Sequence, residues 1–255
     1  MIKASFISTK FSPFIYVFLL TLIGTTIGLL DARTVAANEP SDTKQNFTLI
    51  FKLPPKGAPG PRTDAGSRDT CPVTPIGLTA IVPGKNAGQT LSDRPTIWAY
   101  VPFQGNKKSY LELEIKKARF GTLKVVPLPV PSSPGIIQIP FPSDIPAMKI
   151  GDRYIWKLNY TCDISRENAP KFVQGSIDRI KLSTTIQQQL TYSKSVEEKI
   201  KIYAENGIWY DLLTVLIIER SKAPQNQTLN RLWTDLMSQE PEINLKELVN
   251  ETISQ

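Results

Sequence analysis

Proline is distributed so unevenly along this 255-residue chain that it decides where helices can form. Sixteen of the 21 prolines fall between Pro54 and Pro146. A proline inside a helix removes a backbone donor and clashes with the preceding turn, so no long helix fits this stretch. Short apolar runs between proline and glycine breaks predict strands instead. The predicted strands span residues 47–53, 78–82, 96–101, 109–115, 122–126, 136–139, 154–160 and 172–182.

Many short strands with turn signals between them predict a proline-rich antiparallel β-sandwich or open barrel over residues 47–182. The clearest strand runs from Leu111 to Ile115, where apolar and acidic side chains alternate as a half-buried strand requires. Residues 183–255 show helical periodicity instead. The predicted fold class is therefore α+β, a β domain followed by a short helical region.

The helical tail contains a pattern that resembles a single tetratricopeptide hairpin, at about residues 193–224. One such hairpin cannot bury its own apolar face. It must therefore pack on the β domain, on a third helix predicted at residues 229–237, or on a partner. Tyr203 and Trp209 are the candidate partner-facing residues of the hairpin. A fourth, short helix is predicted at residues 245–253.

The N-terminus has the three parts of a secretory signal peptide. Lys3 and Lys10 supply positive charge, residues 11–30 are almost wholly apolar, and Val35-Ala36-Ala37 offers the small residues that signal peptidase accepts. Cleavage after Ala37 would leave residues 38–46 as a flexible leader. The alternative is a retained membrane anchor, because 20 apolar residues can span a bilayer. The sequence therefore predicts an exported protein of the periplasm, the outer envelope or the extracellular space.

Export changes the interpretation of the two cysteines, Cys71 and Cys162. In an oxidising compartment two cysteines in one domain predict a structural disulfide. The alternative, a pair of redox-active thiols, lacks the Cys-x-x-Cys spacing typical of that chemistry.

The chain contains no histidine, which excludes Ser-His-Asp triads, Cys-His dyads and His-ligated zinc. Two cysteines are too few for a zinc or iron–sulfur site built from cysteine alone. We identify no catalytic residues, no metal ligands and no cofactor. The one enzymatic alternative is a glycan-active enzyme that uses two carboxylates, for which Asp152, Asp163 and Asp178 near strand ends are the candidates.

Positive charge is concentrated in the first part of the mature chain. Residues 38–182 contain 20 Lys or Arg against 12 Asp or Glu, a net of +8, whereas residues 183–255 carry a net of −3. This asymmetry fits a basic surface for an anionic partner, such as wall polymer, lipopolysaccharide or anionic lipid, or for envelope proteins; the alternative is a β domain and tail that dock on each other. Nucleic acid is not an expected partner, because the basic residues do not interleave with aromatic ones. The candidate binding residues are Arg62, Arg68, Trp98 and Tyr100.

Several short motifs are distinctive when taken together. They lie at residues 60–62, 78–83, 95–102, 134–136, 151–156 and 204–211, with Arg68, Cys71 and Cys162 between them. In combination they resemble the domain of unknown function 928 family of exported proteins, found mainly in photosynthetic bacteria. The resemblance implies no particular activity. It favours a non-catalytic binding or assembly module of the envelope.

Overall fold

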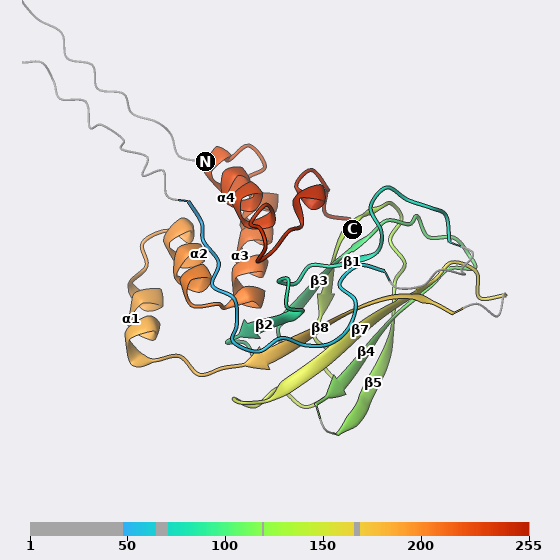
Figure 1. The fold of residues 1–255 in the computed structure, drawn as a ribbon, viewed down its shortest axis with the longest axis horizontal. Coiled ribbons are helices and arrows are strands. Elements are labelled where there is room, and N and C mark those ends of the chain that lie inside the picture. Colours follow the sequence, from blue (N-terminus) through green and yellow to red (C-terminus); the bar gives the residue numbers. More distant parts are fainter. Residues whose placement is uncertain (1–47, 65–70, 119, 166–168, 255) are drawn as a thin grey trace, which may run out of the picture. The chain divides into compact units, whose positions relative to one another are not determined.

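Within the residues described by the computed structural model, which are 48–64, 71–118, 120–165 and 169–254, eight strands form two sheets (Figure 1). The strands are β1 Thr79–Ala80, β2 Ala87–Thr90, β3 Thr96–Val101, β4 Tyr110–Lys117, β5 Gly121–Leu128, β6 Gly135–Pro140, β7 Arg153–Thr161 and β8 Lys171–Arg179. One sheet has the order β1-β3-β6, and the other has the order β2-β8-β7-β4-β5. Helices follow the strands along the chain, which confirms the prediction of an α+β fold.

Alternation of apolar side chains fixes the inner face of the larger sheet. Leu113 and Ile115 of β4 are fully buried and lie opposite Leu158 and Trp156 of β7. Trp156 in turn lies opposite Gly175 of β8, where a Cβ atom would come within 2.7 Å of the indole ring. The glycine therefore makes the space that the largest side chain of this face requires.

The larger sheet is not wholly antiparallel, which corrects the prediction from the sequence. β2 runs parallel to β8, with Ala87 opposite Ser176 and Thr90 opposite Arg179. Its sequence, Ala-Gly-Gln-Thr, carries no strong strand signal, and no strand was expected there. β2 lies at the edge of the sheet, and its pairing depends on β8, which lies almost 90 residues later in the chain.

The helices are α1 Thr184–Tyr192, α2 Val196–Glu205, α3 Trp209–Lys222, α4 Gln227–Met237 and a short 3-10 turn, η1 Lys246–Leu248. Ser195 caps α2 by accepting a hydrogen bond from the Glu198 amide at 3.1 Å. Gly207 joins α2 to α3 with a φ of +70°, a left-handed conformation that suits glycine. The predicted hairpin and third helix are therefore present.

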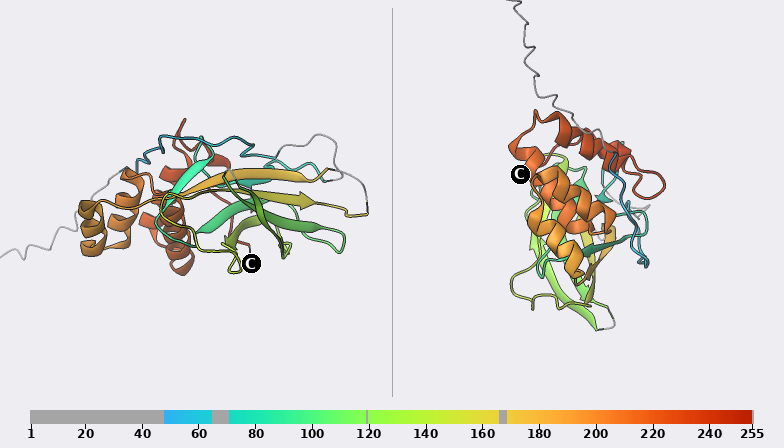
Figure 2. Two further views of the ribbon diagram at one scale, coloured as in Figure 1. Left: turned by 90° about the horizontal axis from the view of Figure 1, so that it is seen from below. Right: turned by 90° about the vertical axis from the view of Figure 1, so that its left-hand side faces the viewer.

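Helix α3 packs directly on the edge strand β2, and the helices gather beside that edge in Figures 1 and 2. A Cβ atom on Gly88 of β2 would lie 2.7 Å from the Tyr210 ring and 3.0 Å from Cβ of Trp209. Side chains of both sheets and of α2, α3 and α4 form one hydrophobic core. Residues 46–255 accordingly make up one compact unit.

Three predicted elements differ from the structure. Residues 48–53 form no strand, because their backbone bonds to helices: the Lys52 amide donates to the Ala204 carbonyl at 3.0 Å. The predicted helix at 245–253 is only the η1 turn, followed by a bridge between Ile253 and Ile136 of β6. The last strand ends at Arg179 rather than at residue 182. Within the described residues, every helix is too short or too polar to span a lipid bilayer.

Candidate functional site

The aromatic pair predicted to contact a ligand lies in the core. Trp98 and Tyr100 of β3 are only 2% and 6% exposed. The indole of Trp98 donates a hydrogen bond to the Thr214 hydroxyl of α3 at 3.0 Å. Burial, together with the charge of Glu251, raises the pKa of Tyr100 to about 12. Both residues join β3 to the C-terminal part of the chain, and neither offers a face to a partner.

Of the two arginines predicted to bind a ligand, only Arg62 lies in the described residues, and its guanidinium bonds to a neighbouring loop. Arg62 donates through one guanidinium nitrogen to the Ile243 carbonyl and through the other to the Asn244 carbonyl at 3.0 Å. It therefore holds the loop after α4 while its side chain stays partly exposed. Arg68 lies outside the described residues.

The hairpin packs within the molecule rather than presenting both predicted residues to a partner. Trp209 is fully buried, and its indole donates to the Ile81 carbonyl at 2.9 Å. Tyr203 is half-buried beside a small cavity of about 160 Å³ that Asp211 also lines. Burial, and secondarily the charge of Asp211, raises the pKa of Tyr203.

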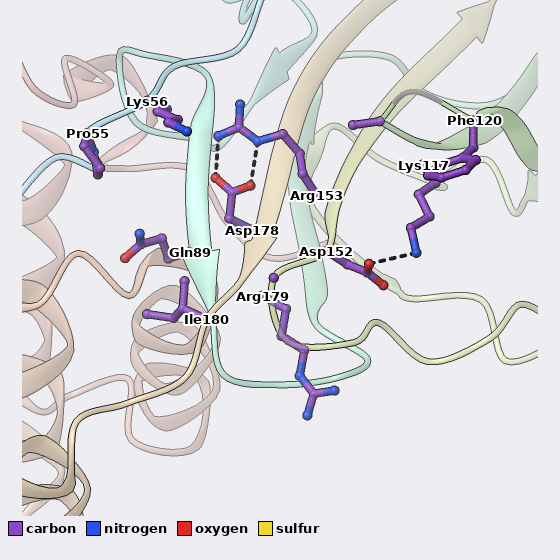
Figure 3. A pocket seen from close by; sticks show the side chains of 12 residues that line it. Pro55, Lys56, Gln89, Lys117, Phe120, Asp152, Arg153, Asp178, Arg179 and Ile180 are labelled. Carbon is purple, nitrogen blue, oxygen red and sulfur yellow. Dashed lines mark hydrogen bonds and ion pairs between the residues drawn. The ribbon is translucent and has the colours of Figure 1, made fainter.

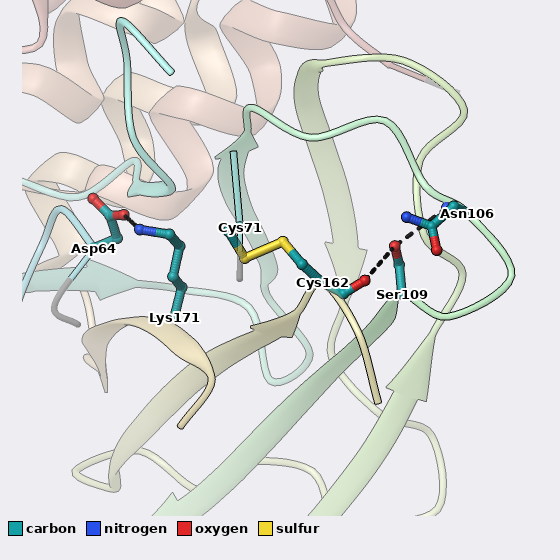
Figure 4. The surroundings of a disulfide bond; sticks show 6 residues. All are labelled: Asp64, Cys71, Asn106, Ser109, Cys162 and Lys171. Atoms are coloured by element: carbon teal, nitrogen blue, oxygen red, sulfur yellow. Dashed lines mark hydrogen bonds and ion pairs between the residues drawn. A yellow bond between two sulfur atoms is a disulfide. The ribbon is translucent and has the colours of Figure 1, made fainter. Parts of the chain in front are cut away.

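The predicted disulfide is confirmed, which excludes the alternative of two free thiols (Figure 4). Cys71 and Cys162 are bonded at 2.05 Å across 91 positions of sequence. Close by, Lys171 at the start of β8 forms an ion pair with Asp64 at 2.6 Å. The two links together fasten the segment before β1 to the ends of β7 and β8.

A pocket of about 550 Å³ lies at the other end of these strands, where β7 begins and β8 ends (Figure 3). We call it the basic pocket. Its charged lining residues are Lys56, Lys117, Arg153, Arg179, Asp152 and Asp178. The lining contains four cations and two carboxylates, so the pocket carries a net charge of +2.

The two carboxylates of the basic pocket are both engaged. Asp178 accepts two hydrogen bonds from the Arg153 guanidinium, each at 2.6 Å. This bidentate pair raises the pKa of Arg153. Asp152 contacts the Lys117 ammonium at 2.7 Å. Burial alone would raise the pKa of Asp152, but the hydrogen bonds from Lys117 and from the Lys149 amide lower it below its ordinary value.

The two remaining cations, Lys56 and Arg179, pair with no carboxylate in the described part of the chain. One terminal nitrogen of Arg179 donates to the Met148 carbonyl, while its Nε is buried and has no partner among the described residues. In Figure 3 the Arg179 guanidinium lies away from both ion pairs. A guanidinium and an ammonium with unused donors form the chemistry that binds phosphate or carboxylate.

The acids proposed for glycan chemistry are only partly brought together. Asp152 and Asp178 line the basic pocket, but Asp163 lies beside the disulfide, where it contacts Lys108 at 3.6 Å. A glycosidase acid must hold a proton, which requires a raised pKa. The pKa of Asp152 is lowered instead. The arrangement favours binding of a negative group over proton transfer.

The sequence did not identify the cations of the basic pocket. Lys117, Arg153 and Arg179 lie 26 to 62 residues apart and meet only through the pairing of β4, β7 and β8. The sequence does place a basic residue near one end of each of these strands. Basic residues at strand ends and turns are common on protein surfaces, so this position alone does not indicate a pocket.

Comparison with known proteins agrees with the sequence motifs. A search of curated proteins finds no match to the chain. A model of the family described as Domain of Unknown Function (DUF928) matches residues 63–253. The match spans both sheets and all four helices, and it includes both cysteines and every charged residue of the basic pocket except Lys56. The chain therefore belongs to the DUF928 family.

Proposed function

We propose that this protein is an exported, non-catalytic binding module of the cell envelope that holds an anionic group in its basic pocket. The observation that carries the proposal is that Lys56 and Arg179, which line different sides of the pocket, both have no carboxylate partner in the described residues. They lie beside two neutralised ion pairs that keep the pocket polar and rigid. The ligand is a phosphate or carboxylate group that a component of the envelope presents.

Two further observations support a location outside the cytoplasm. The Cys71–Cys162 disulfide is of a kind that persists in oxidising compartments. Residues 1–37 have the charge, apolar run and small-residue site of a signal peptide. An exported protein in an envelope meets abundant phosphate and carboxylate polymers, which suits a pocket of net positive charge.

The test compares two soluble polyanions, poly(glycerol phosphate) and polygalacturonate, by isothermal titration calorimetry at low ionic strength. The protein is recovered from the envelope fraction of an exporting host, and we expect its first residue to be Asn38. Binding of at least one polymer should weaken by about tenfold in Lys56→Gln/Arg179→Gln, because charge-assisted hydrogen bonds are lost.

The matched control is Lys107→Gln/Lys108→Gln, which removes the same charge from exposed positions near the disulfide. It should bind like the unmodified protein. Equal weakening in the two double variants would show that net charge, and not the basic pocket, drives binding. Absence of binding by the unmodified protein would overturn the proposal.

A carboxylate-based glycan-active enzyme is the second candidate, because Asp152 and Asp178 line the same pocket. Release of reducing ends from polygalacturonate or from peptidoglycan, abolished by Asp178→Asn, would favour it. Unchanged polymer after prolonged incubation is the result we expect from the lowered pKa of Asp152.

A further inference from the structure

We propose that the basic pocket docks on the anionic phospholipid surface of a membrane, with Phe120 and Ile150 entering the lipid interface beside it. This inference rests on the proposed function, because it specifies what presents the anionic group. It concerns attachment to a membrane surface only.

Two turns at the rim of the basic pocket each present a large apolar side chain to solvent. Phe120 is 74% exposed and Ile150 is 57% exposed. Each residue directly precedes a glycine with positive φ, Gly121 at +82° and Gly151 at +88°. A Cβ atom on either glycine would have no neighbour within 4 Å, so both turns project into open space.

The two turns are fastened to each other and to the strands of the pocket. The Ala118 amide donates to the Arg153 carbonyl at 3.0 Å, and the Gly151 amide donates to the Arg179 carbonyl at 2.8 Å. Between the turns, Lys117 contacts Asp152 at 2.7 Å. These backbone bonds place Phe120 and Ile150 on the same side of the molecule as the basic pocket.

Exposed apolar side chains beside cations fit a lipid surface better than a soluble polyphosphate. Poly(glycerol phosphate) offers little apolar surface to Phe120 or Ile150, whereas burial of both in the interface removes apolar area from water. The headgroups of anionic lipids attract Lys and Arg held near the surface. Lys117 lies 5.7 Å from the centre of the Phe120 ring, so charge and apolar surface are adjacent at the same turn.

The decisive experiment is co-sedimentation of the exported protein with two kinds of vesicle. One kind contains equal parts of phosphatidylglycerol and phosphatidylcholine, and the other contains phosphatidylcholine alone. We expect binding to the first kind only. Phe120→Ser/Ile150→Ser should lower this binding by about tenfold or more, because membrane affinity scales with buried apolar area. Ile150→Ser alone, at a residue outside the lining of the basic pocket, should still bind poly(glycerol phosphate), whereas Lys56→Gln/Arg179→Gln should weaken binding of both vesicles and polymer.

The matched control is Val73→Ser/Ile164→Ser. Both residues are exposed apolar side chains near the disulfide, at the far end of β7. With nine residues, β7 separates its two ends by about 26 Å. The control variant should sediment with vesicles like the unmodified protein.

A direct readout of insertion is Phe120→Trp, whose fluorescence should be quenched by brominated phosphatidylglycerol.

If vesicles are not bound while poly(glycerol phosphate) is, the lipid inference fails and the anion-binding function stands. If Phe120→Ser/Ile150→Ser binds vesicles normally, insertion is refuted. If neither vesicles nor soluble polyanions bind, both proposals fall. Equal sedimentation with the two vesicle types would exclude recognition of anionic lipid.

Discussion

At the scale of single residues, a buried chain of polar groups joins the larger sheet to α3. The Trp156 indole donates to the Tyr210 hydroxyl at 2.9 Å, and that hydroxyl donates to the Ser176 carbonyl at 2.9 Å. Tyr210 is almost completely buried, and burial strongly raises its pKa, so the hydroxyl stays protonated. One hydroxyl therefore satisfies a donor on β7 and an acceptor on β8.

We predict that Tyr210→Phe lowers the free energy of unfolding by about 2 kcal/mol, since a buried donor and a buried acceptor would both lose their partner. Urea denaturation followed by circular dichroism measures the change. Tyr192→Phe is the control, because Tyr192 is 77% exposed on α1 and its loss should leave stability unchanged. Equal stability of Tyr210→Phe and the unmodified protein would refute a structural role for this hydroxyl.

At the scale of elements, a carboxylate links the end of β2 to the beginning of α3. Asp211, in the first turn of α3, accepts hydrogen bonds from the Thr90 hydroxyl at 2.8 Å and from the Leu91 amide at 3.0 Å. Burial raises the pKa of Asp211, although these hydrogen bonds oppose the shift. The folded protein thus binds a proton at Asp211 more readily than the unfolded chain does.

This raised pKa has a defined consequence for stability. The stabilising contribution of the proton on Asp211 is complete below the ordinary aspartate pKa. It is lost as pH rises through the raised pKa that Asp211 has in the folded protein. Asp211→Asn keeps an acceptor but cannot titrate. We therefore expect the variant to gain stability relative to the unmodified protein between about pH 4 and pH 7, measured by urea denaturation at several pH values. Glu205→Gln on the exposed face of α2 should show no such trend; a pH-independent difference for Asp211→Asn would contradict the prediction.

The elements also show what the sequence can and cannot predict. β4 and β7 lie where apolar and polar residues alternate, because one face of each is buried, whereas β3 and β6 lie where short apolar runs predicted strands. β2 was missed, because its four residues owe their burial to α3 and their pairing to β8. The segment at 48–53 has strand-like alternation, yet the Phe51 amide donates to the Gln239 side chain at 2.8 Å. Tertiary contacts override the local pattern at both places.

The basic pocket was unpredictable for a related reason. Lys117, Arg153 and Arg179 come together only because β4 pairs with β7 and β7 with β8 in one register. A shift of one residue would turn alternate side chains to the opposite face. Sequence alone does not specify that register, whereas the disulfide needed only two cysteines and an exported chain.

At the scale of the whole molecule, β7 connects two ends with different roles. The disulfide follows its last residue, and the basic pocket begins at its first. The end with the disulfide is covalently fastened, which restricts the unfolded chain. The end with the pocket carries Lys56 and Arg179, which have no carboxylate partner among the described residues, and the exposed apolar turns. The disulfide and the proposed binding pocket thus lie at opposite ends of β7.

We predict that Cys71→Ala/Cys162→Ala lowers the free energy of unfolding by about 4 kcal/mol, because the bond closes a loop of 91 positions. Urea denaturation with and without dithiothreitol measures this difference. The reduced unmodified protein should coincide with the variant, and the variant should still bind poly(glycerol phosphate). Identical midpoints for the variant and the oxidised protein would refute a stabilising role for the bond.

The packing of residues 48–53 against the helices constrains the order in which the chain can fold. The Gln239 side chain bonds to the backbone of both Leu49 and Phe51, and Ile253 pairs with β6. The earliest described segment is therefore completed by a side chain 188 to 190 positions later in the sequence. Contacts of such long range form slowly. The core around residues 48–53 therefore closes only after Gln239 has been synthesised, whatever the order in which the strands between them pair.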